Sequence, residues 1–167
     1  AVQSPVPMSK NVYLTVQDLL WINLQAVGRP VPYEFAPLED SAYGQYAYGT
    51  SRDVPAQAAR LFRDMAARKP FDAGNNATAF VGFASFLALN GVDLNLTDAD
   101  AGSWVSDALA KPEEVERRVR EATQMHGEHD HSDGHSLSVK SAAQSVFAKY
   151  SQTIKRLVEE EAPVGLR

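Results

Sequence analysis

Apolar positions recur along most of the chain at the three- and four-residue spacing of amphipathic helices. A first helix is predicted after Thr15, which forms a capping box with Asp18, and it should end at Gly28. Further amphipathic helices are predicted over 56–68, after the capping residue Thr97, and from Pro112 onward. The pattern therefore predicts an all-α fold.

The most apolar segment lies at residues 76–90. Apolar side chains cover almost its whole helical surface, at Phe80, Val81, Phe83, Phe86, Leu87 and Leu89. A helix that is apolar all round is typical of a buried core element. The uncharged stretch 73–92 is as long as a membrane span, but asparagines and glycines interrupt it, so we expect a core helix and no membrane partner.

Residues 29–54 show no clear period and carry several aromatic rings between prolines and glycines. Four of the six tyrosines fall here, namely Tyr33, Tyr43, Tyr46 and Tyr48. We expect a loop or a small hairpin. Its rings either pack on the core as a lid or form a binding surface.

The end of the chain combines a polar tract with a final amphipathic segment. Residues 125–135 read MHGEHDHSDGH, and a helix is predicted over about 138–161. Its apolar face consists of Val146, Phe147, Tyr150, Ile154, Leu157 and Val158. A stripe of this size is costly to leave in water, so we expect the helix to pack on its own bundle or on a second copy.

These elements predict a bundle of about six helices with an extra C-terminal helix. The expected organisation is a flexible arm at 1–10, a helical domain at 11–124, a polar linker at 125–137 and the C-terminal helix at 138–167.

Composition narrows the classes of function. The net charge of −5 argues against nucleic acid as a partner, because no basic field would neutralise phosphates. The absence of cysteine excludes thiolate metal sites and cysteine nucleophiles, and it fits a reducing cytoplasm. The first ten residues lack the basic start and apolar run of an intact signal peptide. The expected location is cytoplasmic.

A candidate phosphate-binding turn precedes the core helix. The sequence Ala73-Gly74-Asn75-Asn76 places a glycine and a capping residue immediately before it. The first turn of a helix presents unpaired N–H groups and a partial positive charge, which suit a phosphate. A glycine at this point permits close approach of a ligand.

The wider context of this turn resembles the Fic/Doc family, and its short Doc (death on curing) branch in particular. The resemblance covers roughly Val12 to Thr123 and rests on the opening YLTVQDLL, the helix at 56–68, the stretch KPFDAGNN and the apolar helix ending in Asn90-Gly91. It implies a Fic/Doc-like helical bundle. It also implies transfer of AMP, or in Doc of phosphate, from a nucleotide to a protein hydroxyl.

The catalytic side chains of the family signature are largely replaced. Lys69 stands where the resemblance implies a histidine base, and a protonated ammonium accepts no proton. Ala73 replaces the acidic residue that holds magnesium, and Asn76 with Ala77 replaces two basic residues that hold phosphates. Loss of a base alone costs about 10²–10⁴-fold in rate. We therefore expect no catalytic residues, with Lys69, Gly74, Asn75 and Asn76 remaining as candidate phosphate-binding positions.

All four histidines lie within ten residues, at His126, His129, His131 and His135. Imidazole binds Zn and Ni, but the spacings of three, two and four match no regular metal motif. The tract is therefore interpreted as an acidic linker, with weak Zn or Ni chelation or a folded metal site as the alternatives.

Taken together, the sequence predicts a catalytically inactive Doc-like domain. It would act as a binding, scaffold or toxin–antitoxin-type protein with a protein partner or through self-association, and with at most residual phosphate or nucleotide binding. ATP and magnesium are not expected as cofactors. The alternative is a divergent nucleotide-dependent transferase that modifies a protein hydroxyl.

Overall fold

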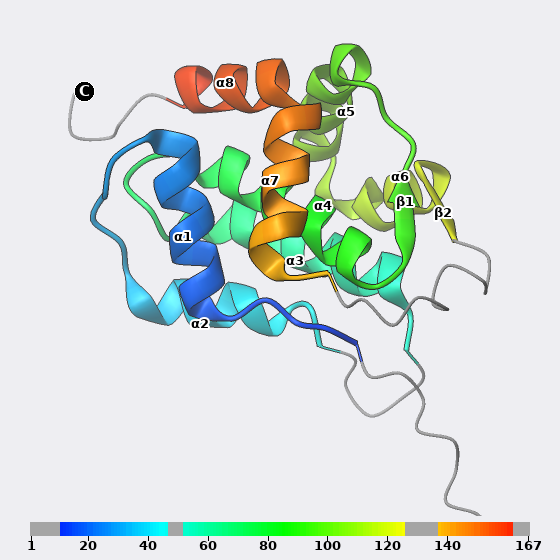
Figure 1. The fold of residues 1–167 in the computed structure, drawn as a ribbon, viewed down its shortest axis with the longest axis horizontal. Helices are drawn as coiled ribbons and strands as arrows, with labels where there is room; N and C mark the ends of the chain where they lie inside the picture. Colours follow the sequence, from blue (N-terminus) through cyan, green and yellow to red (C-terminus); the bar gives the residue numbers. More distant parts are fainter. Residues whose placement is uncertain (1–10, 47–51, 126–136, 162–167) are drawn as a thin grey trace, which may run out of the picture.

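The computed structural model describes residues 11–46, 52–125 and 137–161, and these residues are mostly helical. Figure 1 shows the helices gathered around a central one. The α-helices are α1 (Val16–Val27), α2 (Phe35–Tyr43), α3 (Val54–Arg68), α4 (Asn75–Leu89), α5 (Asp98–Ala110), α6 (Val115–Glu121), α7 (Val139–Lys149) and α8 (Ser151–Glu160). A short 3₁₀ helix, η1 (Pro112–Glu114), precedes α6. The all-α prediction is confirmed, but the described residues contain eight α-helices rather than about six.

Helix α4 is the centre of the fold, as the sequence predicted. Twelve of its 15 residues are buried, and it packs against α1, α3, α7 and α8. Apolar side chains on all sides make this possible, because each face of the helix meets another element. Within the described ranges, no helix has the length and apolarity needed to cross a membrane.

Aromatic rings connect α4 to its neighbours. Phe83 stacks on Trp104 of α5 with 5.5 Å between ring centroids, and both rings contact Phe62 of α3. Phe80 meets the ring of Tyr150 edge to face at 5.1 Å. Such pairs add to the stabilisation from apolar burial and fix the angles at which the helices pack.

The prediction of a loop or hairpin over 29–54 is wrong in part, because α2 lies within it. Leu38, Ser41 and Ala42 are buried at helical spacing against α3. The Ser41 hydroxyl donates to the Pro37 carbonyl. Packing on α3, rather than local propensity, stabilises this nine-residue helix. The rings of Tyr33, Phe35 and Tyr43 remain about half exposed.

A small antiparallel sheet was not predicted. Strand β1 (Val92–Leu94) follows α4 and pairs with β2 (Thr123–Met125), in a register that sets Asp93 opposite Gln124. Three-residue strands carry too short a pattern to stand out in a helical sequence.

The C-terminal segment forms two helices instead of one, divided at Tyr150. Both α7 and α8 pack on α4 of the same chain, which is one of the two arrangements expected (Figure 1, orange to red). The ring of Tyr150 is buried, and its hydroxyl donates to the Leu96 carbonyl at 2.8 Å. The carboxylate of Asp98 accepts hydrogen bonds from the amides of Gln152 and Thr153, which lie in the first turn of α8. These bonds favour the start of a new helix after Tyr150.

Candidate functional site

The candidate site is the turn that joins α3 to α4. Helix α3 is capped at its C-terminus by Lys69, whose φ of 46° is left-handed, and α4 begins after Gly74, whose φ is 76°. A Cβ atom at position 74 would lie 2.5 Å from Cγ2 of Val27. Both the backbone conformation and the close approach of α1 therefore require glycine at this position.

Asn23 of α1 connects that helix to the turn by hydrogen bonds. This buried side chain donates from Nδ2 to the Ala73 carbonyl at 2.9 Å and to the Thr78 hydroxyl at 3.1 Å. A buried amide group whose two N–H bonds are both donated in this way fixes the local geometry. In the sequence, Asn23 lies at helical spacing from Leu19, Leu20 and Val27, so a polar residue on an apolar helix face is the signal that could have indicated it.

A second support comes from the chain just before α2. The amide of Asp72 donates to the Pro32 carbonyl, and the amide of Glu34 donates to the Pro70 carbonyl. These bonds make Tyr33 and Phe71 an isolated antiparallel bridge. The turn is thus fixed on two sides by backbone or amide hydrogen bonds.

Asn75 occupies the first position of α4, rather than the capping position that the sequence suggested. Its Oδ1 accepts from the Phe71 amide at 2.9 Å, and its Nδ2 donates to the Phe71 carbonyl at 2.6 Å. The side chain therefore closes the turn on itself. The N-cap residue is Gly74, which has no side chain to cap the helix.

The first turn of α4 is capped instead by a carboxylate from the far end of the chain. Glu161 Oε2 accepts from the Asn75 amide at 3.0 Å and from Asn75 Nδ2 at 2.8 Å. Glu161 Oε1 accepts from the Asn76 amide at 2.9 Å. Three donors converge on one oxyanion at the positive end of a helix, which is the arrangement that binds phosphate or carboxylate groups.

Nothing in the sequence indicated this role for Glu161. It ends a run of three glutamates and lies 86 residues after Asn75. Its position follows from the docking of α8, because the residue lies directly after the last turn of that helix and its own amide donates to the Leu157 carbonyl.

The remaining predicted positions have different environments. Lys69 is exposed, and its Nζ has no hydrogen bond or ion pair with any residue that the structure describes. Asn76 contributes its backbone amide to the site, while its Oδ1 is buried without a partner within the described ranges. Ala73 and Ala77 are buried, with Ala77 fully enclosed, so a basic side chain at 77 would place a charge in the core.

The four histidines His126, His129, His131 and His135 lie outside the described residues, in the interval 126–136. Within the described residues, no three His, Cys, Asp or Glu side chains lie close enough together to hold a metal ion. Weak Zn or Ni binding by the histidine tract therefore stays a prediction from sequence.

Comparison with protein-family models finds no match to this chain, and comparisons with curated proteins and with solved structures find no match either. The interpretation of the site consequently rests on the residues of the turn and on their geometry.

Proposed function

We propose that this chain is a non-catalytic, Doc-like binding domain whose oxyanion-binding turn is closed by its own Glu161. The observation that carries the proposal is the set of three hydrogen bonds from Asn75 and Asn76 to that carboxylate. The donors are suited to an oxyanion, and the chain supplies one itself.

The loss of chemistry follows from the residues around the turn. A buried alanine at position 73 has no ligand to offer magnesium, which neutralises developing charge in phosphoryl transfer. Lys69 stands where the resemblance implies the base, and an ammonium accepts no proton. Binding needs only the donors of the turn, so it survives the replacements that remove catalysis.

An intramolecular carboxylate competes with any ligand for the same donors. Because Glu161 is tethered, its effective concentration at the turn is high, and a free phosphate must displace it. The apparent affinity for phosphate is then lowered by the fraction of molecules in which the turn is open. We therefore propose that the turn recognises a phosphate group, on a nucleotide or on a protein partner, only when α8 withdraws Glu161.

The test compares Glu161→Gln with Glu160→Gln. Glu160 is the adjacent exposed carboxylate, and no hydrogen bond or ion pair joins its side chain to the described residues of the turn. Its substitution changes the net charge by the same amount as Glu161→Gln. Binding of inorganic phosphate and of ATP, each with and without Mg²⁺, is followed through the NMR signals of the Asn75 and Asn76 amides. We expect Glu161→Gln to bind phosphate at least tenfold more tightly than the wild type or Glu160→Gln.

Two results would separate this proposal from its alternatives. Equal phosphate affinity in all three proteins would show that Glu161 does not close a binding turn. Tighter binding of ATP that depends strongly on Mg²⁺, together with transfer of AMP or phosphate to a protein, would favour the divergent transferase. The retained glycine turn and its amide donors are the features that favour that second candidate.

A further inference from the structure

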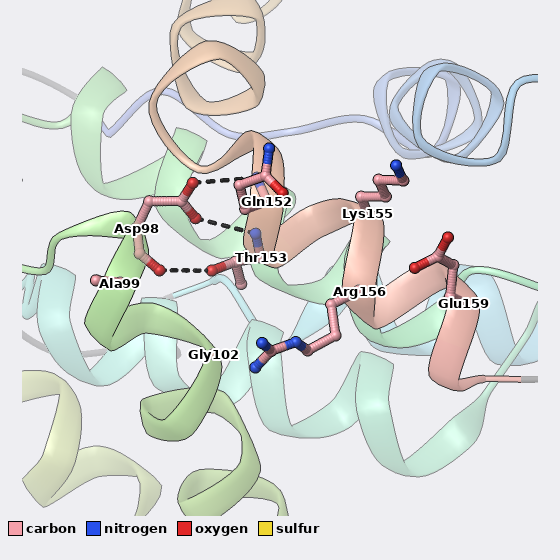
Figure 2. Close-up of a pocket in the computed structure, with 8 residues that line it drawn as sticks. All are labelled: Asp98, Ala99, Gly102, Gln152, Thr153, Lys155, Arg156 and Glu159. Atoms are coloured by element: carbon pink, nitrogen blue, oxygen red, sulfur yellow. Dashed lines mark hydrogen bonds between the residues drawn. The ribbon is translucent and has the colours of Figure 1, made fainter.

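Helix α8 is fixed at its beginning by a carboxylate of α5. Asp98 Oδ2 accepts from the Gln152 amide at 3.0 Å, and Oδ1 accepts from the Thr153 amide at 2.9 Å. The Thr153 hydroxyl donates in return to the Asp98 carbonyl at 2.9 Å. Figure 2 shows these three bonds joining the first turn of α5 to the first turn of α8.

The two ends of α8 therefore make the same kind of contact in opposite roles. At its N-terminus the helix donates amides to Asp98, and just beyond its C-terminus it supplies the carboxylate of Glu161 to the amides of α4. Each contact places a negative charge at the positive end of a helix. The chain of contacts runs from α5 through α8 to the candidate site.

Between its two ends, α8 packs on the core through a narrow buried face. Thr153, Ile154 and Leu157 are buried, while cavities lie along both flanks of the helix. The cavity on the α5 side measures about 480 Å³ and reaches Gly102 and Arg156. The cavity on the α1 side measures about 390 Å³ and reaches Gln25 and Ala26. Helix α8 packs on α4 and α5 and less extensively on α1, so the contacts at its two ends add to this packing in setting its orientation.

The hydrogen bonds from α8 keep the carboxylate of Asp98 ionised and bound to the first turn of that helix. Burial by itself would raise the pKa of Asp98, but hydrogen bonds from Thr153 and Gln152 outweigh it and lower the pKa below the ordinary value of 3.8. Lys155, Arg156 and Glu159 line the same cavity on the α8 side. None of their side chains has a hydrogen bond or an ion pair with another residue in the described part of the chain.

We infer that Asp98 is a positioning residue for Glu161, so that it controls whether the α4 turn is open to an oxyanion. A ten-residue helix is a rod about 15 Å long. Fixing its first turn restricts where its far end can lie, and thereby raises the effective concentration of Glu161 at the turn. Release of the first turn lets the far end move. The inference rests on the proposed function for its consequence, and on the two sets of hydrogen bonds for its mechanism.

The experiment measures amide hydrogen exchange in the first turn of α4, where Glu161 binds, and in the middle of the same helix. Asp98→Asn removes one acceptor and the charge. Asp100→Asn is the matched control, because Asp100 is exposed in the same first turn and, among the described residues, its carboxylate accepts a hydrogen bond from the Thr97 hydroxyl alone. We expect the Asn75 and Asn76 amides to exchange at least tenfold faster in Asp98→Asn. The Phe83 and Phe86 amides in the middle of α4 should keep their rates, as should every amide near α4 in Asp100→Asn.

A double substitution distinguishes positioning from general destabilisation. In a Glu161→Gln background the Asn75 and Asn76 amides already lack their charged acceptor, so adding Asp98→Asn should change their exchange less than twofold. A tenfold further increase in that background would overturn the inference, since Asp98 would then act without Glu161. Unchanged exchange at Asn75 and Asn76 in Asp98→Asn alone would overturn it as well.

Thr153→Val provides a milder variant should Asp98→Asn not fold. It removes one of the three bonds between α5 and α8 and keeps the buried volume. The same pattern of exchange is expected at a smaller amplitude, and its absence counts against the inference. These exchange results are independent of the proposed function, which fails separately if Glu161→Gln exposes the amides and still binds no phosphate.

Discussion

The N-termini of α1 and α4 solve the same problem in two ways. At α1, Thr15 accepts from the Asp18 amide at 3.0 Å and Asp18 accepts from the Thr15 amide at 2.8 Å. At α4, Gly74 has no side chain that could cap the helix. The acceptor is the carboxylate of Glu161, which directly follows the last residue of α8. The cap of α1 is formed by residues within one four-residue segment, while the cap of α4 forms only when α8 has docked on the bundle.

The difference concerns what each cap is able to regulate. A local cap stabilises its own helix, and its formation does not depend on the docking of any other segment, because its two partners are three residues apart. A cap supplied by a distant segment leaves whenever that segment undocks, and it exposes the helix N-terminus to other anions. Under the function proposed above, the α4 turn is the end at which binding and conformation would be coupled.

The largest effect is expected from adding one methyl group at the α4 end. Gly74→Ala would place Cβ 2.5 Å from Val27 Cγ2 and impose a left-handed φ on alanine, so we expect a loss of about 2–4 kcal/mol. Gly28→Ala, at the end of α1, is the control, because its φ is also positive but no atom lies within 4 Å of the new Cβ. It should lose only about 1 kcal/mol in urea unfolding. Equal losses would mean that the close contact with α1 is unimportant.

Removing each cap sharpens the comparison directly. Thr15→Ala should lower the free energy of unfolding by about 1 kcal/mol and affect amide exchange only in the first turn of α1. Glu161→Gln should cost about 1–2 kcal/mol, because it weakens charge-assisted bonds that join two helices. It should also accelerate exchange in both α4 and α8. If the increase in the exchange rate were confined to α8, the α4 turn would not depend on Glu161.

The docking of the C-terminal helices on α4 is testable through Tyr150. Burial, with a smaller contribution from the charge of Asp98, raises the pKa of its phenol from 10.0 to about 12. Since this folded-state pKa is higher than that of the unfolded chain, the contribution to stability is complete below pH 10 and is lost as the pH rises toward 12. Ultraviolet titration should show one of the six tyrosines ionising near pH 12, and Tyr150→Phe should remove that step. An unchanged titration curve in the variant would contradict the buried position.

The smallest effect is expected at Lys69, where the chain leaves α3 for the turn. Its left-handed φ of 46° is unfavourable for a residue with a side chain, so Lys69→Gly should stabilise the protein by up to about 1 kcal/mol. Lys111, which ends α5 with a φ of −133°, is the control, and Lys111→Gly should not stabilise. A loss of stability in Lys69→Gly would reveal a packing role for the lysine side chain.

Much of the fold could be predicted because its signals are local. The capping box at Thr15, the glycine stop at Gly28 and the apolar surface of 76–90 each depend on residues within one or two turns, and each has its counterpart in the structure. Helix α2 could not be predicted in this way, since its stability comes from burial against α3. The break at Tyr150 likewise depends on Asp98, 52 residues earlier in the chain.

The sequence by itself determined the chemical content of the candidate site: a glycine turn, an asparagine at the start of the core helix, and a lysine and an alanine at positions 69 and 73. Only the tertiary structure decided what occupies the turn. A helix N-terminus attracts whichever carboxylate the packing of other elements brings to it, and that electrostatic preference has no fixed spacing in sequence. Asn23 and Glu161 therefore became visible as parts of the site only when α1 and α8 were docked on α4.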